Sequence, residues 1–250
     1  GVNAVFSKNQ NKITRMVTDA RYILTNDFGL IGGARSSSQV TALAEGYEAG
    51  AFFLYTTSGV ADTPEKLEAF KEVFPTARMG DLIYDDNNND GKISEADRVY
   101  CGSGLPEYEA GVTLNAEYRG FDISMQWYAA IGHELMNGAK AMAYGYGRHK
   151  DLLYAWSEAN PDSPIPSYRA DIKSHDNFKG YTDLWLEDGT YLRLKNVTLG
   201  YSFPKSILQS VGIQRTRIFV TAQNPITFTK YEGYDPEIGG GIENRGLDKG

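Results

Sequence analysis

The sequence predicts an all-β protein built from antiparallel strands, and three observations support this class. Apolar and polar residues alternate with period two in several segments, which is the pattern of strands with one apolar and one polar face. The 250 residues include 17 Tyr and 27 Gly, a composition that suits strands joined by turns. No segment approaches the run of about 18 apolar residues that a transmembrane helix needs, so a helical membrane protein is excluded.

Charge and cysteine content narrow the function classes further. The formal net charge is −7 and Lys and Arg form no run, which argues against nucleic acid as a partner. Cys101 is the only cysteine, so the chain has no internal disulfide and no cysteine-based metal site. We expect no functional role for Cys101, because no base adjoins it in the sequence.

The first part of the chain reads as strands with one short helix. Residues 1–15 lack the regions of a signal peptide and resemble a strand already under way, so we interpret the chain as a fragment. Residues 49–60 are a strand candidate. Residues 63–74 predict an amphipathic helix with Thr63 as its N-cap and Pro64 at its first position.

The clearest local structure is a β-hairpin in residues 111–132, where Arg119 and Gly120 separate two alternating runs. In a soluble sandwich its apolar face meets a second sheet. In an outer-membrane barrel that face meets lipid and the polar face lines an aqueous lumen. Periodicity does not separate these alternatives, although Tyr118 and Phe121 beside the turn slightly favour a barrel, whose aromatic residues gather at the membrane interfaces. The predicted apolar face comprises Val112, Leu114, Ala116, Tyr118, Phe121, Ile123, Met125, Trp127, Ala129 and Ile131.

Two further strands are predicted downstream, around residues 190–203 and 216–229, with Pro204 ending the first. Residues 138–188 have weak periodicity and read as large loops, with one helix near residues 152–158. Residues 235–250 form a Gly-rich tail without a strand pattern.

One motif carries the residue types of a metal site. Residues 86–97 match an EF-hand-type calcium loop, D-x-N-x-D-G-x-I-x-x-x-D, and Ca²⁺ binds about six to eight oxygens at flexible geometry. The last position is Asp rather than Glu and no paired helices flank the loop, which argues against a regulatory sensor. We predict a structural Ca²⁺ site, with a metal-free Asn/Asp-rich turn as the alternative. The predicted ligands are Asp86, Asn88, Asp90, the Lys92 carbonyl and Asp97.

No catalytic site is predicted. The histidines at positions 133, 149 and 175 are widely spaced and lack any known ligand pattern. Glu187 and Asp188 are adjacent, so on a strand they point to opposite faces and do not form a glycosidase pair. The loop aromatics Trp156, Tyr168, Tyr181 and Trp185 are expected to anchor their own loops more often than to hold a ligand.

Five segments resemble, in the same order, the C-terminal region of SusC/RagA-like TonB-dependent outer-membrane transporters of Bacteroidetes. Together they span residues 45 to 238, and the earlier residues match more loosely. The second segment is similar to the family's G-D-x-x-Y-x-D-x-N-x-D-G-x-I-x-x-x-D-R element. The segments are EGYEAGAFFLYTTSGV, MGDLIYDDNNNDGKISEADRV, AGVTLNAEYRGFDISMQWYAAIGHELMN, DGTYLRLKNVTLGYSFPKSIL and RIFVTAQNPITFTKYEGYDPEI.

The resemblance implies the C-terminal part of a large antiparallel transmembrane β-barrel of about 22 strands with long extracellular loops. It implies import of oligosaccharides, or of peptides, across the cell outer membrane with a SusD-like surface lipoprotein. TonB would act through a region absent from this chain. Under this interpretation residues 1–80 form barrel strands and a loop with the short helix, residues 81–100 a calcium-loop-like insert, and residues 101–250 barrel strands with a long loop at 133–190. The final closing strand is missing, so the rest of the same barrel is a required partner.

Two other functions stay open at this point. A soluble, secreted carbohydrate-binding or adhesin β-sandwich stiffened by calcium uses the same apolar faces as a core. A glycoside hydrolase needs two carboxylates that converge in a cleft, and the sequence shows no motif for it.

Overall fold

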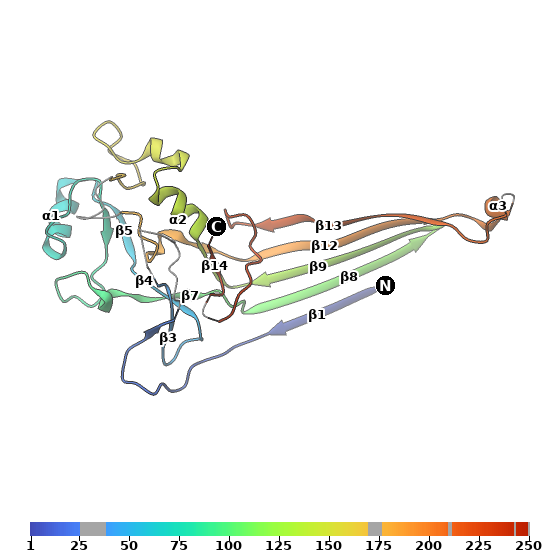
Figure 1. Cartoon of the computed structure of the whole chain (residues 1–250), viewed down its shortest axis with the longest axis horizontal. Helices are drawn as coiled ribbons and strands as arrows, with labels where there is room; N and C mark the ends of the chain where they lie inside the picture. Colours follow the sequence, from blue (N-terminus) through green and yellow to red (C-terminus); the bar gives the residue numbers. More distant parts are fainter. Residues whose placement is uncertain (26–38, 170–176, 210–211, 243, 250) are drawn as a thin grey trace. The chain divides into compact units, whose positions relative to one another are not determined.

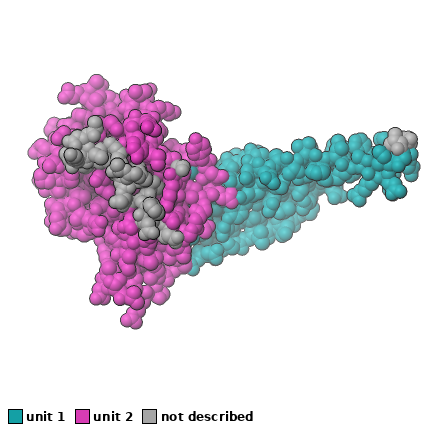
Figure 2. All heavy atoms as spheres, in the orientation of Figure 1, with its two compact units in different colours: residues 1–10, 105–133, 188–231 teal, residues 11–104, 134–187, 232–250 magenta. Residues whose placement is uncertain are grey.

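The computed structural model describes residues 1–25, 39–169, 177–209, 212–242 and 244–249. The chain forms two compact units, each assembled from segments that are distant in the sequence. Unit 1 comprises residues 1–10, 105–133 and 188–231, and unit 2 comprises residues 11–104, 134–187 and 232–250 (Figure 2). These units follow packing rather than chain order, and the sequence-based division at residues 80 and 100 stays a prediction.

Unit 1 is one five-stranded antiparallel sheet with the strand order β1-β8-β9-β12-β13 (Figure 1). A short helix, α3 (Lys205–Leu208), lies in the connection between β12 and β13. The strands are β1 (Val2–Lys8), β8 (Tyr108–Tyr118), β9 (Phe121–Ile131), β12 (Tyr191–Ser202) and β13 (Arg217–Thr229).

The hairpin predicted at residues 111–132 is confirmed as β8 and β9. Its register pairs Tyr118 with Phe121 and Leu114 with Met125. Arg119 and Gly120 form a two-residue turn with φ values of +48° and +89°. Positive φ at both central positions is the type I′ geometry, whose twist matches that of the flanking strands.

The strands predicted around residues 190–203 and 216–229 are confirmed as β12 and β13, and the sheet is regular except at one place. Between Leu194 and Asn196 the register of β12 shifts against both neighbouring strands. Against β9 the extra residue is Lys195, and against β13 the extra residue is on β13, where Asn224 and Pro225 face Lys195 alone. Opposite it, β13 contains Pro225, a residue that has no N–H for the ladder and is tolerated at bulges.

Unit 2 is built from short strands and helices. Three small sheets have the orders β2-β3-β4-β7, β11-β10-β14 and β5-β6. Its strands are β2 (Ile23–Leu24), β3 (Thr41–Leu43), β4 (Ala51–Leu54), β5 (Thr57–Val60), β6 (Leu82–Tyr84), β7 (Val99–Ser103), β10 (Glu134–Asn137), β11 (Leu186–Asp188) and β14 (Leu247–Asp248). Its helices are α1 (Pro64–Val73), α2 (Gly138–Gly145) and the 3₁₀-helices η1 (Glu95–Asp97), η2 (Lys150–Tyr154) and η3 (Asp183–Trp185).

A buried apolar cluster holds the segments of unit 2 together. Phe52 and Leu54 from β4, Met136 from β10, Trp185 from η3 and Leu247 from β14 all belong to it, and none is more than 4% exposed. These residues are up to 195 positions apart (247 − 52), so the core forms only when distant segments meet.

Two local expectations in unit 2 are confirmed and two are wrong. The Thr63 side chain accepts a hydrogen bond from the Lys66 N–H at the start of α1, as predicted. The strand candidate at residues 49–60 forms β4 and β5. The helix expected at residues 152–158 is instead the 3₁₀-helix η2, and the tail contains the short strand β14.

The helix within residues 138–188 was predicted at the wrong place, and the signal for its actual place is local. The loop's helix is α2, which starts at Gly138 because the Asn137 side chain accepts a hydrogen bond from the Lys140 N–H at 2.9 Å. Asn137 was thus an available start signal. In the described part of the chain, no helix has both the length and the apolar character to cross a membrane.

Candidate functional site

The five strands of unit 1 present one continuous apolar face. Cross-strand partners lie on the same face of a sheet, and the registers bring apolar residues opposite one another on all five strands. Val220 is 75% exposed and Phe6 is 69% exposed, so this surface is not covered within the chain. The face comprises Val2, Ala4, Phe6, Val112, Leu114, Ala116, Tyr118, Phe121, Ile123, Met125, Trp127, Leu192, Leu194, Val197, Leu199, Tyr201, Ile218, Val220, Ala222, Ile226 and Phe228.

The opposite face of the same sheet is mainly polar. Arg217 makes a two-pronged ion pair with Asp122, with donor–acceptor distances of 3.0 and 2.5 Å. Thr198 and Thr221 share a hydrogen bond of 2.9 Å. The Tyr128 hydroxyl donates to Glu109, and the Lys195 amine lies 5.4 Å from the centre of the Tyr128 ring. The sheet therefore separates an apolar surface from a polar one, as the alternation predicted.

Both ends of the sheet are defined by its connections. At one end the Arg119–Gly120 turn joins β8 to β9 directly. At the other end, near Lys8, Tyr108 and Tyr191, the chain leaves for the segments of unit 2. The connection between β12 and β13, which contains α3, lies at the turn end too, so that end holds one tight turn and one longer connection. The longest connections are at the other end, and such an asymmetry is found in outer-membrane barrels.

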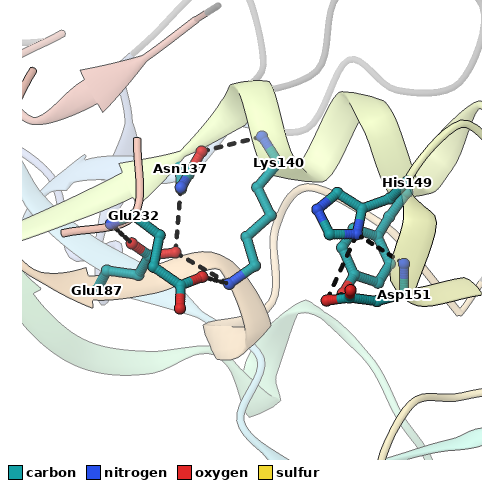
Figure 3. A network of polar contacts seen from close by, with 7 residues as sticks. Asn137, Lys140, His149, Asp151, Glu187 and Glu232 are labelled. Atoms are coloured by element: carbon teal, nitrogen blue, oxygen red, sulfur yellow. Dashed lines mark hydrogen bonds and ion pairs between the residues drawn. The ribbon is translucent and has the colours of Figure 1, made fainter. Parts of the chain in front are cut away.

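A polar network fixes the long loop of unit 2 at the start of α2 (Figure 3). The Lys140 amine lies 3.2 Å from a Glu187 carboxylate oxygen and 2.5 Å from a Glu232 oxygen. Asn137 also donates to Glu187, at 3.1 Å. Burial lowers the pKa of Lys140, but its bonds to Glu232 and Glu187 outweigh burial and leave this pKa above its ordinary value.

A stacked aromatic pair lies beside a carboxylate in the same region, and Figure 3 labels His149 of this pair and the carboxylate of Asp151. The rings of Tyr144 and His149 stack with centroids 4.3 Å apart. The Tyr144 hydroxyl donates to Asp151 at 3.0 Å, and the Nδ1 of His149 lies 3.5 Å from the same carboxylate. Desolvation and the Asp151 contact both raise the pKa of Tyr144. These contacts tie η2 to α2.

The sequence did not indicate two charged residues that unit 2 buries. Asp81 is fully buried, with Arg169 at 2.6 Å and the Asn177 side-chain N–H at 3.1 Å. Arg98 is 4% exposed and lies 5.1 Å from the ring centres of both Tyr55 and Tyr181. Each joins segments that are distant in the sequence, and single-sequence periodicity carries no signal for such pairs.

The five predicted calcium ligands lie in one folded loop. The Asp86 carboxylate accepts hydrogen bonds from the N–H groups of Asp90 and Gly91, at 3.1 and 2.8 Å. Asp90 accepts from the N–H of Lys92, and the Asn88 side chain donates to Asp90 at 3.1 Å.

Asp97 is fully buried and closes this loop. Its carboxylate accepts from the N–H groups of Ser94 and Asn88, at 2.7 and 3.3 Å. Within the residues that the structure describes, no group of three His, Cys, Asp or Glu side chains that could hold a metal ion occurs. Calcium binding by this loop stays a prediction.

Three other residues considered in the sequence analysis, His133, Trp185 and Cys101, pack within their own units. His133 is buried in unit 1 and its ring is edge-on to Tyr191, whereas residue 175 lies outside the described residues. Trp185 is 1% exposed and belongs to the core. Burial raises the pKa of the Cys101 thiol to about 11.

The chain is similar to known receptors over most of its length. It is 30% identical over 235 residues to TonB-dependent receptor P3 of Formosa agariphila, which covers 93% of this chain and 22% of that protein. It is 26% identical over 244 residues to TonB-dependent receptor SusC of Bacteroides thetaiotaomicron, covering 94% of the chain and 22% of SusC. The chain thus spans about a fifth of the length of these relatives. No protein-family model matches it.

The solved structures that resemble it have the same fold. A structure of the RagAB peptide transporter superposes with a TM-score of 0.71 at 22% identity, covering 96% of this chain and 24% of the other. The RagAB peptide importer in its "open-open" state gives 0.69, with the same identity and shares of each chain. The predicted fold class, a part of a large antiparallel β-barrel, is confirmed.

Proposed function

The chain is homologous over most of its length to SusC/RagA-like TonB-dependent transporters, and from this we propose that it forms part of the wall and external loops of such a transporter. One observation carries the proposal: the sheet of unit 1 has one apolar and one polar face across five strands, and the apolar face is exposed. In a barrel wall, the first face meets lipid and the second lines the lumen.

The strand lengths support this role. The strands β8, β9, β12 and β13 have 11 to 13 residues, and a tilted strand of about 9–11 residues crosses the hydrocarbon core of a bilayer. The location that follows is the cell outer membrane. The Arg119–Gly120 turn then lies on the periplasmic side, and the segments of unit 2 are external loops.

The partners follow from the relatives. SusC and the RagAB pair support assembly with a SusD-like surface lipoprotein, and the names of the relatives support coupling to TonB. The free edges of β1 and β13 leave backbone groups for neighbouring strands, so the rest of the same barrel is the third partner.

The cargo class is an oligosaccharide or a peptide, and the chain has no catalytic role. Peptides are the cargo named for RagAB. The test is uptake by cells that lack the full-length transporter, compared with cells that carry it, using labelled oligosaccharides and labelled peptides. Loss of uptake of one cargo, and the same loss without TonB, supports the proposal. Equal uptake of every cargo with and without the transporter contradicts it.

The soluble-sandwich alternative is not favoured. A sandwich core needs the apolar face of the sheet to pack against a second sheet. Leu199 is 54% exposed and Ile218 is 58% exposed on that face.

We also propose that the loop of residues 86–97 holds a structural Ca²⁺. The supporting observation is that this loop wraps around the Asp86 carboxylate and places Asn89 and Gly91 at positive φ, as expected for a tight oxygen-lined loop. The remaining ligands would be Asn88, Asp90, the Lys92 carbonyl and Asp97.

The metal itself can be tested directly. Calorimetric titration of the full-length transporter with Ca²⁺ should give one site that the substitution Asp90→Ala removes. Asp19→Ala, on a carboxylate outside the loop, is the control. An identical titration for the Asp90 variant and the unaltered protein argues against calcium here.

A further inference from the structure

The turn end of the unit 1 sheet carries a row of aromatic side chains on its apolar face. Tyr118 is 70% exposed and Phe121 is 55% exposed. The Phe121 and Tyr201 rings are 4.6 Å apart, and Phe203 meets Tyr201 edge-on at 5.1 Å. Aromatic rings at the end of a spanning strand lie at the headgroup level of a bilayer.

Two arginines lie beside this row with their charges uncompensated. Arg119 places its guanidinium 5.2 Å from the centre of the Tyr118 ring, and Arg215 is exposed. Within the described part of the chain, neither forms an ion pair. Arg217 differs, because Asp122 holds it through two hydrogen bonds.

Arg119 and Arg215 line one shared pocket. Its volume is about 580 Å³, and its walls come from both faces at the turn end of the sheet. Tyr118 and Phe121 belong to the apolar face, and Glu117, Asp122 and Arg217 belong to the polar face. Glu117 contributes the one carboxylate of the lining that Arg217 does not neutralise, so the lining has an excess of one positive charge. An anion is the ligand that complements such a pocket.

The connection between β12 and β13 adds apolar surface at the same end of the strands. Ile207 is 56% exposed and Ile213 is 46% exposed, and the cations Lys205 and Arg215 stand in the same connection. Exposed isoleucines among lysine and arginine are typical of segments that lie in a membrane interface. A free phosphate ion would not use this apolar surface, whereas a lipid would.

We propose that this end of the sheet binds the headgroup of an anionic phospholipid. The guanidinium groups of Arg119 and Arg215 donate N–H groups to the phosphate oxygens, a pairing that matches the planar fork of arginine. Tyr118 and Phe121 lie beside the lipid where its headgroup meets its chains. This inference rests on the proposed membrane location, and it adds a specific lipid site to it.

The test uses the full-length transporter in detergent micelles and native mass spectrometry. Phosphatidylglycerol and phosphatidylcholine with the same acyl chains are titrated separately, and the bound lipids are counted. We expect the protein to retain phosphatidylglycerol in preference. The double variant Arg119→Asn, Arg215→Gln should lower that affinity by about 30-fold, the effect of two cations near an anionic lipid. Asn is chosen because it tolerates the positive φ of the turn.

Two controls separate the site from general effects. Lys8→Gln removes a cation that lies 5.1 Å from the Tyr108 ring at the opposite end of the strands, and it should leave phosphatidylglycerol binding at the pocket within about twofold because Lys8 does not line that pocket. The double variant with lysine at both positions should keep most of the binding, which shows that the charge and not the fold was lost.

The outcomes distinguish this inference from the proposed function. Equal retention of the two lipids, or unchanged retention by the double variant, overturns the lipid site. Complete displacement of the lipid by excess inorganic phosphate overturns it as well. Membrane location is checked separately by flotation of the protein with outer membranes; its failure overturns the proposed function itself.

Discussion

Unit 1 exposes many of its apolar side chains, whereas unit 2 buries its own. In unit 1, Val220 and Phe6 are 75% and 69% exposed, whereas in unit 2 Phe52 and Leu54 are fully buried. A soluble protein rarely exposes a large contiguous apolar patch. Unit 2 therefore supplies its own apolar surroundings, whereas the sheet of unit 1 needs them from outside. Under the proposed function, lipid provides them.

The largest effect is expected in the core of unit 2. Phe52→Ala removes a fully buried ring from the apolar cluster and should cost about 3–5 kcal/mol of the unit's stability. Leu153→Ala, at a site 85% exposed, should change stability by less than about 0.5 kcal/mol. Resistance of the loops to protease in the full-length transporter measures both. Equal protease resistance of the two variants would show that the burial of Phe52 does not stabilise unit 2.

A charge on the apolar face tests unit 1. Val197→Arg should destabilise the transporter in lipid vesicles by about 2–4 kcal/mol, because Val197 lies at the middle of β12 on the apolar face and an arginine near the middle of the bilayer loses its hydration. Gln126→Arg places the same charge on the polar face and should cost well under half as much. Denaturant unfolding in vesicles gives both values, and equal costs would show that the two faces have the same surroundings.

The reactivity of the Cys101 thiol measures how far this residue of β7 is buried in unit 2. Burial, followed by repulsion from Asp183, raises the pKa of its thiol from 9.0 to about 11. The reactive thiolate is therefore depleted below this pH, and alkylation at pH 8 should be roughly 100-fold slower than in the unfolded chain. The rate should rise with pH through about 11. Mass spectrometry of the peptide that contains Cys101 follows the reaction; a rate equal to that of the denatured protein would place the thiol in solvent.

The smallest effect on stability is expected at the N-cap of α1. Thr63→Ala removes the side-chain cap of α1 and should cost about 1 kcal/mol. Thr63→Ser keeps the hydroxyl and should restore most of the loss. Hydrogen exchange at α1 measures this, and identical exchange in the alanine variant would show that the cap does not stabilise the helix.

The predictability of the two units differs for a physical reason. The strands of unit 1 were predictable because alternation is a local property that fixes which side chains share a face, and the turn at Arg119 and Gly120 is local too. In unit 2 the cap at Thr63 and the strand candidate at residues 49–60 were of this kind. The parallel pairing of Met136 with Leu247 depends on residues far apart in sequence.

The candidate site follows the same division. The apolar and polar faces of β8 and β9 could be predicted from residues 111–132, and those of β12 and β13 from their own alternation. The buried pair of Asp81 and Arg169 and the Lys140 network could not, because each arises from tertiary contacts. The calcium loop was recognisable by its spacing, and its binding of metal stays a prediction.

The most direct test of the account is the solvent that each face of the unit 1 sheet meets. Spin labels at Leu199→Cys and Gln126→Cys in the full-length transporter in lipid vesicles would be compared for relaxation by oxygen, which enters lipid, and by a water-soluble nickel chelate. We predict strong oxygen and weak nickel relaxation at position 199, and the reverse at position 126. Protection of position 199 from both reagents would place the apolar face in a protein core and contradict the account.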